Sequence, residues 1–579
     1  MKKPKQAETV SLRTPWGEQL PEQPWSVYPR PMMRRDSFFC LNGKWEFSAK
    51  GVLEGAEILV PFAPESILSG IGAHMGDAPR LRYRKRFVLP EGFVKDRVLL
   101  HFGAVDQIAR VTLNGQELGR HEGGYDAFSF DVTDALQAEN LLAVEVEDDL
   151  DDGVLPWGKQ KNRRGGMWYT PVSGIWQTVW LESVPTTYVQ GLRITSNAEF
   201  AEIKALGVEE GRLLVTTPAG VEEYALSHGK ALVSPKSVRM WSPEDPYLYF
   251  FELQSGADRV TSYFALRSIT VERVEGIPRL CLNGVPYFFH GLLDQGYYSD
   301  GIYTPASPKG YEFDVRSMKE LGFNTLRKHI KVEPEQFYYD CDRLGMVVFQ
   351  DMVNNGDYSF LRDTALPTLG IKRLNDKRMH RDPATRAAFL EGMERTVRQL
   401  SNHPCILYWT IFNEGWGQFD GKSAYERLKQ LDSTRIIDTV SGWFAGAPSD
   451  VESLHVYFKP VRIKGANEEK PLVLSEFGGY SYKPEGHVFN PKDTYGYRFF
   501  KDRSAFEEAL ITLYEKEILP ARDKGLCAAI YTQVSDVEDE TNGLYSYDRR
   551  ICKVDGERMR ALSRALRFEN GEDTTKEQA

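Results

Sequence analysis

Hydrophobic and polar residues alternate along the first part of the chain with the two-residue period of half-buried β-strands. The segment "ARVTLNGQELGRHEGGYDAFSFDVTD" carries this pattern on both sides of Asn114-Gly115, a dipeptide typical of tight hairpin turns. "GIWQTVWLE" at 174–182 repeats it. We therefore expect residues 1–184 to form a jelly-roll β-sandwich, and the β-rich stretch 185–270 to form a smaller Ig-like β-sandwich.

From residue 271 the pattern changes, and short apolar runs alternate with stretches of helical period. Helices are predicted over 314–321, 334–344 and 389–400, and glycines follow the first two. Eight runs have the composition of buried strands: "PYFFHG", "FNTLR", "MVVFQD", "CILYWTIFNE", "RIIDT", "SLHVY", "LVLSE" and "LCAAIYTQ". Eight parallel strands separated by helices or long loops predict a (β/α)8 barrel over residues 271–579.

Several of these runs end on a residue that can carry chemistry. Glu414 and Glu476 end the fourth and seventh runs, and Arg327, Asp351 and Tyr457 end the second, third and sixth. Residues at the carboxyl ends of barrel strands converge on one site. A carboxylate after "YWTIF" or "PLVLS" is costly to bury without a function. Two such glutamates are what retaining glycoside hydrolysis needs, one protonated to donate to the leaving oxygen and one ionised to attack the anomeric carbon.

Composition and charge narrow the range of partners. The 579 residues carry a formal net charge of −10, which argues against nucleic acid as the main partner. No run of about 18 apolar residues occurs, so no membrane span is expected. The first twenty residues lack an apolar run and the six cysteines form no Cys-x-x-Cys pair. Both features favour a cytoplasmic protein with reduced thiols and no zinc site.

The motifs around the strand ends resemble those of glycoside hydrolase family 2, which includes β-galactosidases, β-glucuronidases and β-mannosidases. "WTIFNEGWG" is similar to the acid/base signature of the family, and "LVLSEFGG" to its nucleophile signature. "SMKELGFNTLRKHIKVEPEQFYYDCDRLGMVVFQD" resembles its strand-two to strand-three segment, and "HFGAVDQIARVTLNGQELGRHEGGYDAFSFDVT" its sugar-binding jelly roll. The resemblance covers nearly the whole chain in the expected order of domains.

This resemblance implies a role for each strand-end residue. Glu414 is the expected general acid/base and Glu476 the expected nucleophile. Asn413 would hydrogen-bond the 2-hydroxyl of the sugar, a contact that strengthens toward the transition state. Tyr457 and Arg327 would hold Glu476, and the charge of Arg327 would keep it ionised. The chemistry implies no metal and no organic cofactor.

Three departures from the family pattern concern the substrate. The stretch "HGLLDQGYYSDG" after the first strand replaces the Arg-x-x-Arg-His-like stretch of the large β-galactosidases, so His290, Asp294 and Gln295 are expected to form a different wall of the sugar site. "QDM" offers only Asp351 where the family often has Asp-Glu, which makes a magnesium site doubtful. The Asn-x-Lys clamp of the β-glucuronidases is missing from "DVEDETNGLYSYDRR", which disfavours a glucuronide.

The basic segment "RKHIK" favours an acidic sugar instead, because cations at the mouth of the site would attract one. The competing interpretation, which we prefer, makes Lys328 and Lys331 solvated loop residues. For His329, a sugar hydroxyl contact and a structural hydrogen bond are equally supported.

Aromatic and polar side chains near the strand ends complete the set of candidate site residues. Trp416 and Tyr531 are predicted to stack on a sugar face. Trp168 and Tyr169 are interpreted as packing at a domain interface. Two interpretations, sugar contacts and a solvated acidic loop, remain for three residues at or after the end of the eighth run: Gln533, Asp536 and Glu538.

The sequence thus predicts a retaining exo-β-glycosidase acting on small glycosides or oligosaccharides, with a β-galactoside as the first expectation. A second hypothesis keeps this mechanism and changes the sugar to a glucuronide, mannoside or arabinoside. A third is a carbohydrate-binding pseudoenzyme, which the presence of both glutamates disfavours. Assembly into a homo-oligomer is an open expectation that rests on analogy with relatives.

Overall fold

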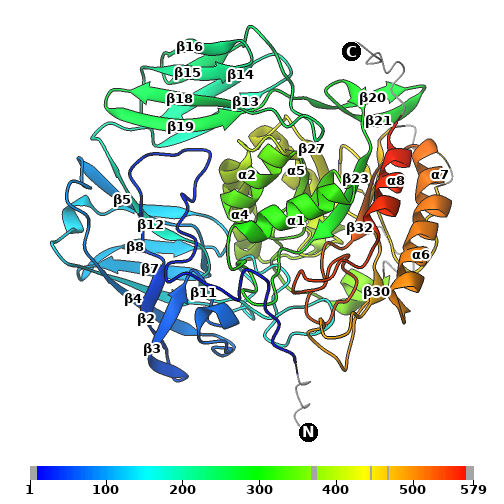
Figure 1. Cartoon of the computed structure of the whole chain (residues 1–579), viewed down its shortest axis with the longest axis horizontal. Coiled ribbons are helices and arrows are strands. Elements are labelled where there is room, and N and C mark those ends of the chain that lie inside the picture. Colours follow the sequence, from blue (N-terminus) through cyan, green and yellow to red (C-terminus); the bar gives the residue numbers. More distant parts are fainter. Residues whose placement is uncertain (1–8, 367–374, 444–445, 464, 466–468, 569–579) are drawn as a thin grey trace.

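The computed structural model describes residues 9–366, 375–443, 446–463, 465 and 469–568. Two β-sandwiches and a barrel make up the molecule (Figure 1): the first sandwich lies at the left of the view, the second above it, and the barrel at the right. This arrangement confirms the predicted fold class. No helix in the described part of the chain is long and apolar enough to cross a membrane.

The first sandwich consists of a four-stranded and a six-stranded antiparallel sheet, in the orders β1-β12-β5-β9 and β3-β2-β4-β10-β7-β8. Alternate residues of its strands enter the core; in β10, for example, Leu142, Val144 and Val146 are buried while their neighbours are more exposed. Its strands are β1 (Phe39–Cys40), β2 (Gly43–Ala49), β3 (Leu53–Val60), β4 (Arg80–Phe87), β5 (Arg97–Phe102), β6 (Val105–Asp106), β7 (Ile108–Leu113), β8 (Gln116–Glu122), β9 (Phe128–Asp131), β10 (Asn140–Glu147), β11 (Gly174–Ile175) and β12 (Val179–Val184).

The second sandwich has sheets of three and four strands, β13-β14-β17 and β16-β15-β18-β19, and a separate three-stranded sheet, β20-β21-β22, leads into the barrel. The strands are β13 (Gly191–Ser196), β14 (Ala201–Leu206), β15 (Gly211–Thr217), β16 (Gly220–Leu226), β17 (Lys230–Val233), β18 (Tyr249–Ser255), β19 (Asp258–Phe264), β20 (Ile269–Val274), β21 (Ile277–Leu282) and β22 (Val285–Pro286).

The barrel is an eight-stranded, nearly closed parallel sheet in the order β27-β26-β25-β24-β23-β32-β29-β28. Its strands are β23 (Phe289–Asp294), β24 (Thr325–Lys328), β25 (Val347–Asp351), β26 (Ile406–Asn413), β27 (Ile436–Ser441), β28 (Glu452–Val456), β29 (Leu472–Gly478) and β32 (Leu526–Thr532). Each overlaps one of the eight predicted runs. Most of their residues are buried, as expected when helices cover one face of a parallel sheet and side chains fill the other.

Helices surround the barrel, and their ends follow local sequence signals. The side chain of Asp382 accepts a hydrogen bond from the Thr385 amide and caps α4, and Gly345 ends α2 in the left-handed conformation. The described α-helices are α1 (Lys309–Glu320), α2 (Glu335–Leu344), α4 (Pro383–Leu400), α5 (Gly421–Leu431), α6 (Arg503–Leu513), α7 (Leu519–Asp523) and α8 (Gly556–Leu566). The barrel region also has the short helical segments η3 (Leu361–Ala365), η4 (Asp376–Arg378) and η5 (Tyr514–Ile518) and the small strands β30 (Tyr480–Tyr482) and β31 (Arg498–Phe500). Two further short helical segments, η1 (Ile67–Ser69) and η2 (Thr133–Ala135), belong to the first sandwich.

A long connection of the first sandwich, residues 153–170 and here called the arm, reaches the carboxyl ends of the barrel strands. The Trp157 amide and indole donate to the carbonyls of Asn354 and Gly356, which follow β25, at 3.0 Å each. At its other end the Thr170 amide donates to Glu538 after β32, at 2.9 Å. The arm thus brings side chains of the first sandwich to the carboxyl end of the barrel, where the chemistry of such barrels is located.

Candidate active site

Glu414 stands directly after β26, at a sharp turn of the backbone. Its φ angle of 50° lies in the left-handed region, which is uncommon for a residue with a side chain. The turn is fixed by two backbone hydrogen bonds, from the Glu414 amide to the Ser441 carbonyl at 3.0 Å and from the Trp416 amide to the Asn413 carbonyl at 2.8 Å. A strained conformation held in this way is a feature of functional sites.

Glu476 lies within β29 and is held by cationic and hydroxyl donors. One oxygen accepts from Arg327 Nη1 at 3.0 Å, and the other accepts a hydrogen bond from the Tyr457 hydroxyl. Burial alone would raise the pKa of this carboxyl, but His455, Arg327 and His329 outweigh burial and lower the pKa to about 2. Glu476 is therefore ionised at neutral pH.

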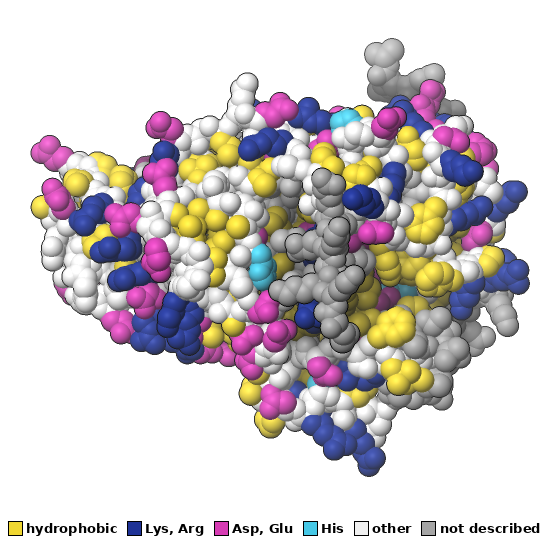
Figure 2. All heavy atoms as spheres, turned by 90° about the horizontal axis from the view of Figure 1, so that it is seen from below, with side chains coloured by type: hydrophobic (Ala, Val, Ile, Leu, Met, Phe, Trp, Pro, Cys, Tyr) yellow, Lys and Arg dark blue, Asp and Glu magenta, His cyan; other side chains and the backbone are white. Residues whose placement is uncertain are grey.

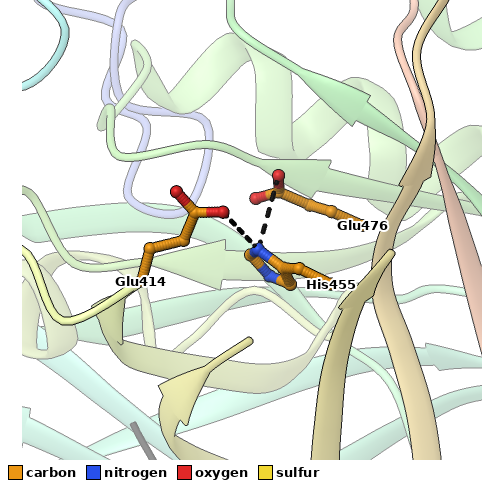
Figure 3. A group of neighbouring side chains, drawn as sticks. All are labelled: Glu414, His455 and Glu476. Atoms are coloured by element: carbon orange, nitrogen blue, oxygen red, sulfur yellow. Dashed lines mark hydrogen bonds and ion pairs between the residues drawn. The ribbon is translucent and has the colours of Figure 1, made fainter. Parts of the chain in front are cut away.

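His455 lies between the two glutamates (Figure 3). Its Nδ1 is 2.8 Å from an oxygen of Glu414 and 3.6 Å from an oxygen of Glu476. Its Nε2 is 3.3 Å from Arg327 Nη1. The two hydrogens of Arg327 Nη1 also have the Ser475 carbonyl and Glu476 as acceptors, at 3.0 Å each. A carboxylate can only accept, so the hydrogen between His455 and Glu414 is carried by Nδ1. His455 therefore donates a hydrogen bond to Glu414.

The two carboxylates are close to each other. The oxygens of Glu414 and Glu476 and the Nδ1 atom of His455 all lie within 4.8 Å of one another. Retaining glycosidases hold their two carboxyl groups about 5–5.5 Å apart, whereas inverting enzymes leave about 6.5–9.5 Å for a water molecule.

Arg327 organises the base of the site. Its Nη2 donates to the side-chain oxygen of Asn413 and to the Ser441 hydroxyl, at 2.9 Å each. Its Nε donates to Asp351 at 3.0 Å, and Asp351 in turn lies 2.9 Å from His329 Nδ1. Since Arg327 occupies the oxygen of Asn413, the amide nitrogen of Asn413 is the atom left to donate to a ligand.

His290 and Asp294, predicted to form a wall of the sugar site, lie outside it. The side chain of His290 points from β23 toward the helical layer, where its Nε2 is 3.1 Å from the Tyr514 hydroxyl. Asp294 forms a buried ion pair with Lys328, with 2.6 Å between its carboxylate oxygen and the Lys328 ammonium. In a strand, successive side chains alternate between faces, so the strand position alone does not say which residue faces the site.

Lys328 and Lys331 are not solvated, contrary to the preferred interpretation. Both side chains are almost completely buried, and their ammonium groups each lie 2.9 Å from Glu333. They therefore carry no free charge that could attract an acidic sugar. Figure 2 shows the lower face of the molecule as oriented in Figure 1, on which basic and acidic side chains are interspersed.

Tyr531 and Gln533 are buried behind the site rather than open to it. Tyr531 is fully buried, so no face of its ring is available to a sugar, and its hydroxyl accepts from the Tyr480 amide at 3.1 Å. Gln533 donates from its amide nitrogen to Glu540 at 2.8 Å and to Asn542 at 2.7 Å. Its geometry makes it a support for Glu540.

The two acidic residues left open after the eighth run are buried as well. Asp536 pairs with Lys553 at 2.6 Å, and Glu538 pairs with Arg164 of the arm at 3.4 Å. A solvated acidic loop is therefore wrong for this segment. Glu538 serves to dock the arm on the barrel.

Trp416 is the predicted aromatic residue that does stand beside the acid/base candidate. Its ring centroid is 5.2 Å from that of Trp168, which belongs to the arm, and 6.5 Å from that of His329. The buried indole nitrogen of Trp416 has no protein partner among the described residues. Trp168 thus packs between the first sandwich and the barrel.

Three residues near the site were not singled out from the sequence. His455 lies two residues before Tyr457 in the run "SLHVY", and this spacing puts both on one face of a strand, so it could have been found. Lys159 of the arm and Glu540 after β32 carry no comparable local signal. Only the packing of the first sandwich on the barrel places them near the catalytic candidates.

Comparison with known proteins identifies the family. Residues 306–556 match the model of the glycosyl hydrolases family 2 TIM barrel domain, and residues 76–164 match the glycosyl hydrolase 2 galactose-binding domain-like model. Together the two matches cover more than half of the chain. The chain belongs to glycoside hydrolase family 2.

Individual relatives of this family 2 member carry two different activities in their names. The chain is 25% identical over 470 residues to human β-glucuronidase, with 68% of each chain covered. It is 24% identical over 389 residues to a β-galactosidase of Thermoanaerobacter pseudethanolicus, covering 61% of this chain and 47% of that protein.

A solved structure supports the fold of the whole chain. The β-D-glucuronidase of Dictyoglomus thermophilum superposes with a TM-score of 0.72 at 18% identity, covering 93% of this chain and 98% of that one. Membership of the family makes the protein a glycoside hydrolase, and the superposition shows that it shares the fold of this structure.

Proposed function

We propose that this protein is a retaining exo-β-glycosidase in which Glu476 is the nucleophile and Glu414 the general acid/base. The observation that carries the proposal is the unequal environment of two carboxylates whose oxygens lie within 4.8 Å of each other. Glu476 is bonded to a guanidinium, which favours its ionised form. Glu414 contacts the imidazole of His455, at 2.8 Å, instead of a guanidinium.

The proposed reaction has two displacements. Glu476 attacks the anomeric carbon while Glu414 protonates the leaving oxygen, and a covalent glycosyl-enzyme forms. Glu414, now ionised, then removes a proton from water, which attacks the same carbon and releases Glu476. The net result is hydrolysis with retained configuration.

The polar groups around the glutamates assist both displacements. Asn413, whose oxygen is held by Arg327, presents its amide nitrogen to the 2-hydroxyl of the sugar. Tyr457 holds the Glu476 oxygen that Arg327 does not contact, and is itself 3.0 Å from the Thr532 hydroxyl. His455 keeps one oxygen of Glu414 occupied, which directs the proton to the other.

A β-galactoside is the proposed substrate. The cations at and after the end of β24 are paired within the protein: Arg327 with Asp351 and Glu476, and Lys328 and Lys331 with Asp294 and Glu333. A neutral sugar fits this charge distribution. A β-glucuronide is the second candidate, because proteins named β-glucuronidase are among the relatives. A mannoside and an arabinoside are further alternatives with the same mechanism.

The first test is turnover of a panel of p-nitrophenyl glycosides, with β-galactoside, β-glucuronide, β-mannoside and arabinosides compared under one condition. We expect the β-galactoside to have the highest kcat/KM, and the released sugar to keep the β-configuration when followed by NMR. Release of the α-anomer first would overturn the proposed mechanism. A panel without turnover but with measurable sugar binding would favour the pseudoenzyme.

A further inference from the structure

Lys159 of the arm is a buried cation beside the acid/base candidate. Its ammonium lies 5.1 Å from the ring centroid of Trp416, 5.8 Å from that of Tyr169 and 6.0 Å from that of Trp168. The residue is 6% exposed. Among the residues that the structure describes, no carboxylate comes within 4 Å of this ammonium. Burying a charge in this way is unfavourable unless cation–π contacts or a ligand compensate.

Glu540 is a buried carboxylate in the same part of the site. It is 4% exposed, and one of its oxygens is fixed by the amide of Gln533 at 2.8 Å. Burial raises the pKa of Glu540, and Lys159 is the cation that most strongly opposes this rise. Repulsion from Glu476 raises it further, which places Glu540 within electrostatic range of the nucleophile as well.

The segments that carry Lys159 and Glu540 are firmly tied to each other. Arg164 pairs with Asp539 at 3.2 Å, and the Thr170 amide donates to Glu538 at 2.9 Å. In spite of this close docking, Lys159 and Glu540 do not form an ion pair. Gln533 holds the carboxylate and the aromatic rings hold the ammonium, so a donor and an acceptor of opposite charge are kept apart.

We propose that Lys159 and Glu540 bind hydroxyl groups of the terminal sugar, Lys159 as donor and Glu540 as acceptor, so that the first sandwich takes part in sugar selection. Each hydroxyl can both donate and accept, and adjacent hydroxyls of a neutral sugar can satisfy both charges at once. A uronide carboxylate would gain from Lys159 but would be repelled by Glu540. The inferred substrate class is therefore a neutral glycoside with free hydroxyls, and this inference rests on the proposed function.

The first test compares Lys159→Met with a matched variant, Lys161→Met. Lys161 also belongs to the arm, but its ammonium lies 4.0 Å from the ring centroid of Trp157 and 5.4 Å from that of Trp168, whereas the ammonium over Trp416 is that of Lys159. We expect Lys159→Met to lower kcat/KM for the best neutral glycoside about 10- to 100-fold, the effect of losing a charged hydrogen bond. Lys161→Met should keep kcat/KM within about threefold, an effect typical of surface changes.

Deoxy-glycosides show whether Lys159 touches the sugar. Each hydroxyl of the best substrate is removed in turn, and the loss in kcat/KM is measured for the wild-type protein and for Lys159→Met. We expect one deoxygenation to cost the wild-type protein at least tenfold and to cost the variant almost nothing, because the contact is already lost. In Glu540→Gln, removal of the same hydroxyl or of its neighbour should no longer lower kcat/KM. Equal penalties in all proteins would overturn the proposal.

Uronides are the remaining substrates in the experiment. A wild-type protein that prefers a β-uronide, and loses this preference in Lys159→Met, would show that Lys159 binds a carboxylate and would overturn the hydroxyl assignment. If no glycoside is turned over, the proposed function fails instead, and calorimetry of galactose binding to the wild-type protein and Lys159→Met then decides on Lys159 separately. Unchanged affinity in the variant would overturn its role in sugar binding.

Discussion

Glu476 and Glu414 are neighbours with unequal surroundings. Glu476 is bonded to Arg327 and Tyr457 and has a pKa of about 2. Glu414 is bonded to His455, and its side chain keeps 13% of its surface exposed. One carboxylate is therefore held in the charged state by a guanidinium, while the other contacts an imidazole and keeps part of its surface open to solvent. The contacts of each carboxylate, rather than the residue type, therefore decide its role in catalysis.

Replacing Glu476 should have the largest effect. Glu476→Ala removes the proposed nucleophile, and we expect kcat for every substrate of the panel to fall about 10⁵-fold, because the glycosyl-enzyme can no longer form. Thermal unfolding should show that the variant is folded. A small external anion such as azide should restore turnover and give an inverted glycosyl product, which NMR can identify. Normal turnover without the anion would contradict the assigned role.

Replacing Glu414 should separate substrates by their leaving group. In Glu414→Ala we expect a loss of about 10³-fold for an alkyl glycoside, which needs a proton on the departing oxygen. A dinitrophenyl glycoside departs without that proton, so its first displacement should be nearly unaffected, and a burst of dinitrophenol should be seen in stopped-flow measurements. An equal loss of activity on both substrates would contradict the assignment of Glu414 as the proton donor.

Replacing Arg327 should make the two glutamates more alike. Arg327→Met removes the cation that keeps Glu476 ionised, so the pKa of Glu476 should rise and a larger fraction should be protonated at any acidic pH. We expect kcat/KM to fall about 10²- to 10³-fold at neutral pH. The acid limb of the pH profile, which the wild-type pKa of about 2 places at very low pH, should move upward. Arg327→Lys should give an intermediate profile, and an unmoved limb in both variants would contradict the assignment.

The part of this picture that sequence could predict is the part set by local pattern. The eight barrel strands and the positions of Glu414 and Glu476 follow from apolar runs of strand length and from where those runs stop. His290 shows the limit of this reasoning, because a position inside a strand does not tell which face its side chain takes.

The rest depends on contacts between distant segments. Lys159 reaches the site only because the arm docks on the loops after β25 and β32, through hydrogen bonds between residues about 200 and 370 positions apart in the chain. Lys328 and Lys331 seemed exposed in a charged run, yet the docking around them buries both with Glu333. Burial of a charge is decided by its three-dimensional partners, which no short stretch of sequence contains.

Replacing His455 should have the smallest effect, and it tests the difference between Glu414 and Glu476 most directly. Its task is to donate a hydrogen bond from Nδ1 to Glu414. An asparagine amide nitrogen can take the place of Nδ1 and keep the bond to Glu414, so His455→Asn should retain kcat/KM within about fivefold. His455→Ala leaves Glu414 without this hydrogen bond and should lose about 30-fold.

The pH profiles of these two variants distinguish hydrogen bonding from proton transfer. If His455 acts as a hydrogen-bond donor alone, the pH profile of His455→Asn should keep the shape of the wild-type profile. Were His455 instead to carry the proton between the glutamates, the asparagine variant would lose as much activity as the alanine variant, because an amide cannot be protonated near neutral pH. In that case the charge state of Glu414 would be set through its neighbour, and the two carboxylates would act as one coupled system rather than as separate acid and nucleophile.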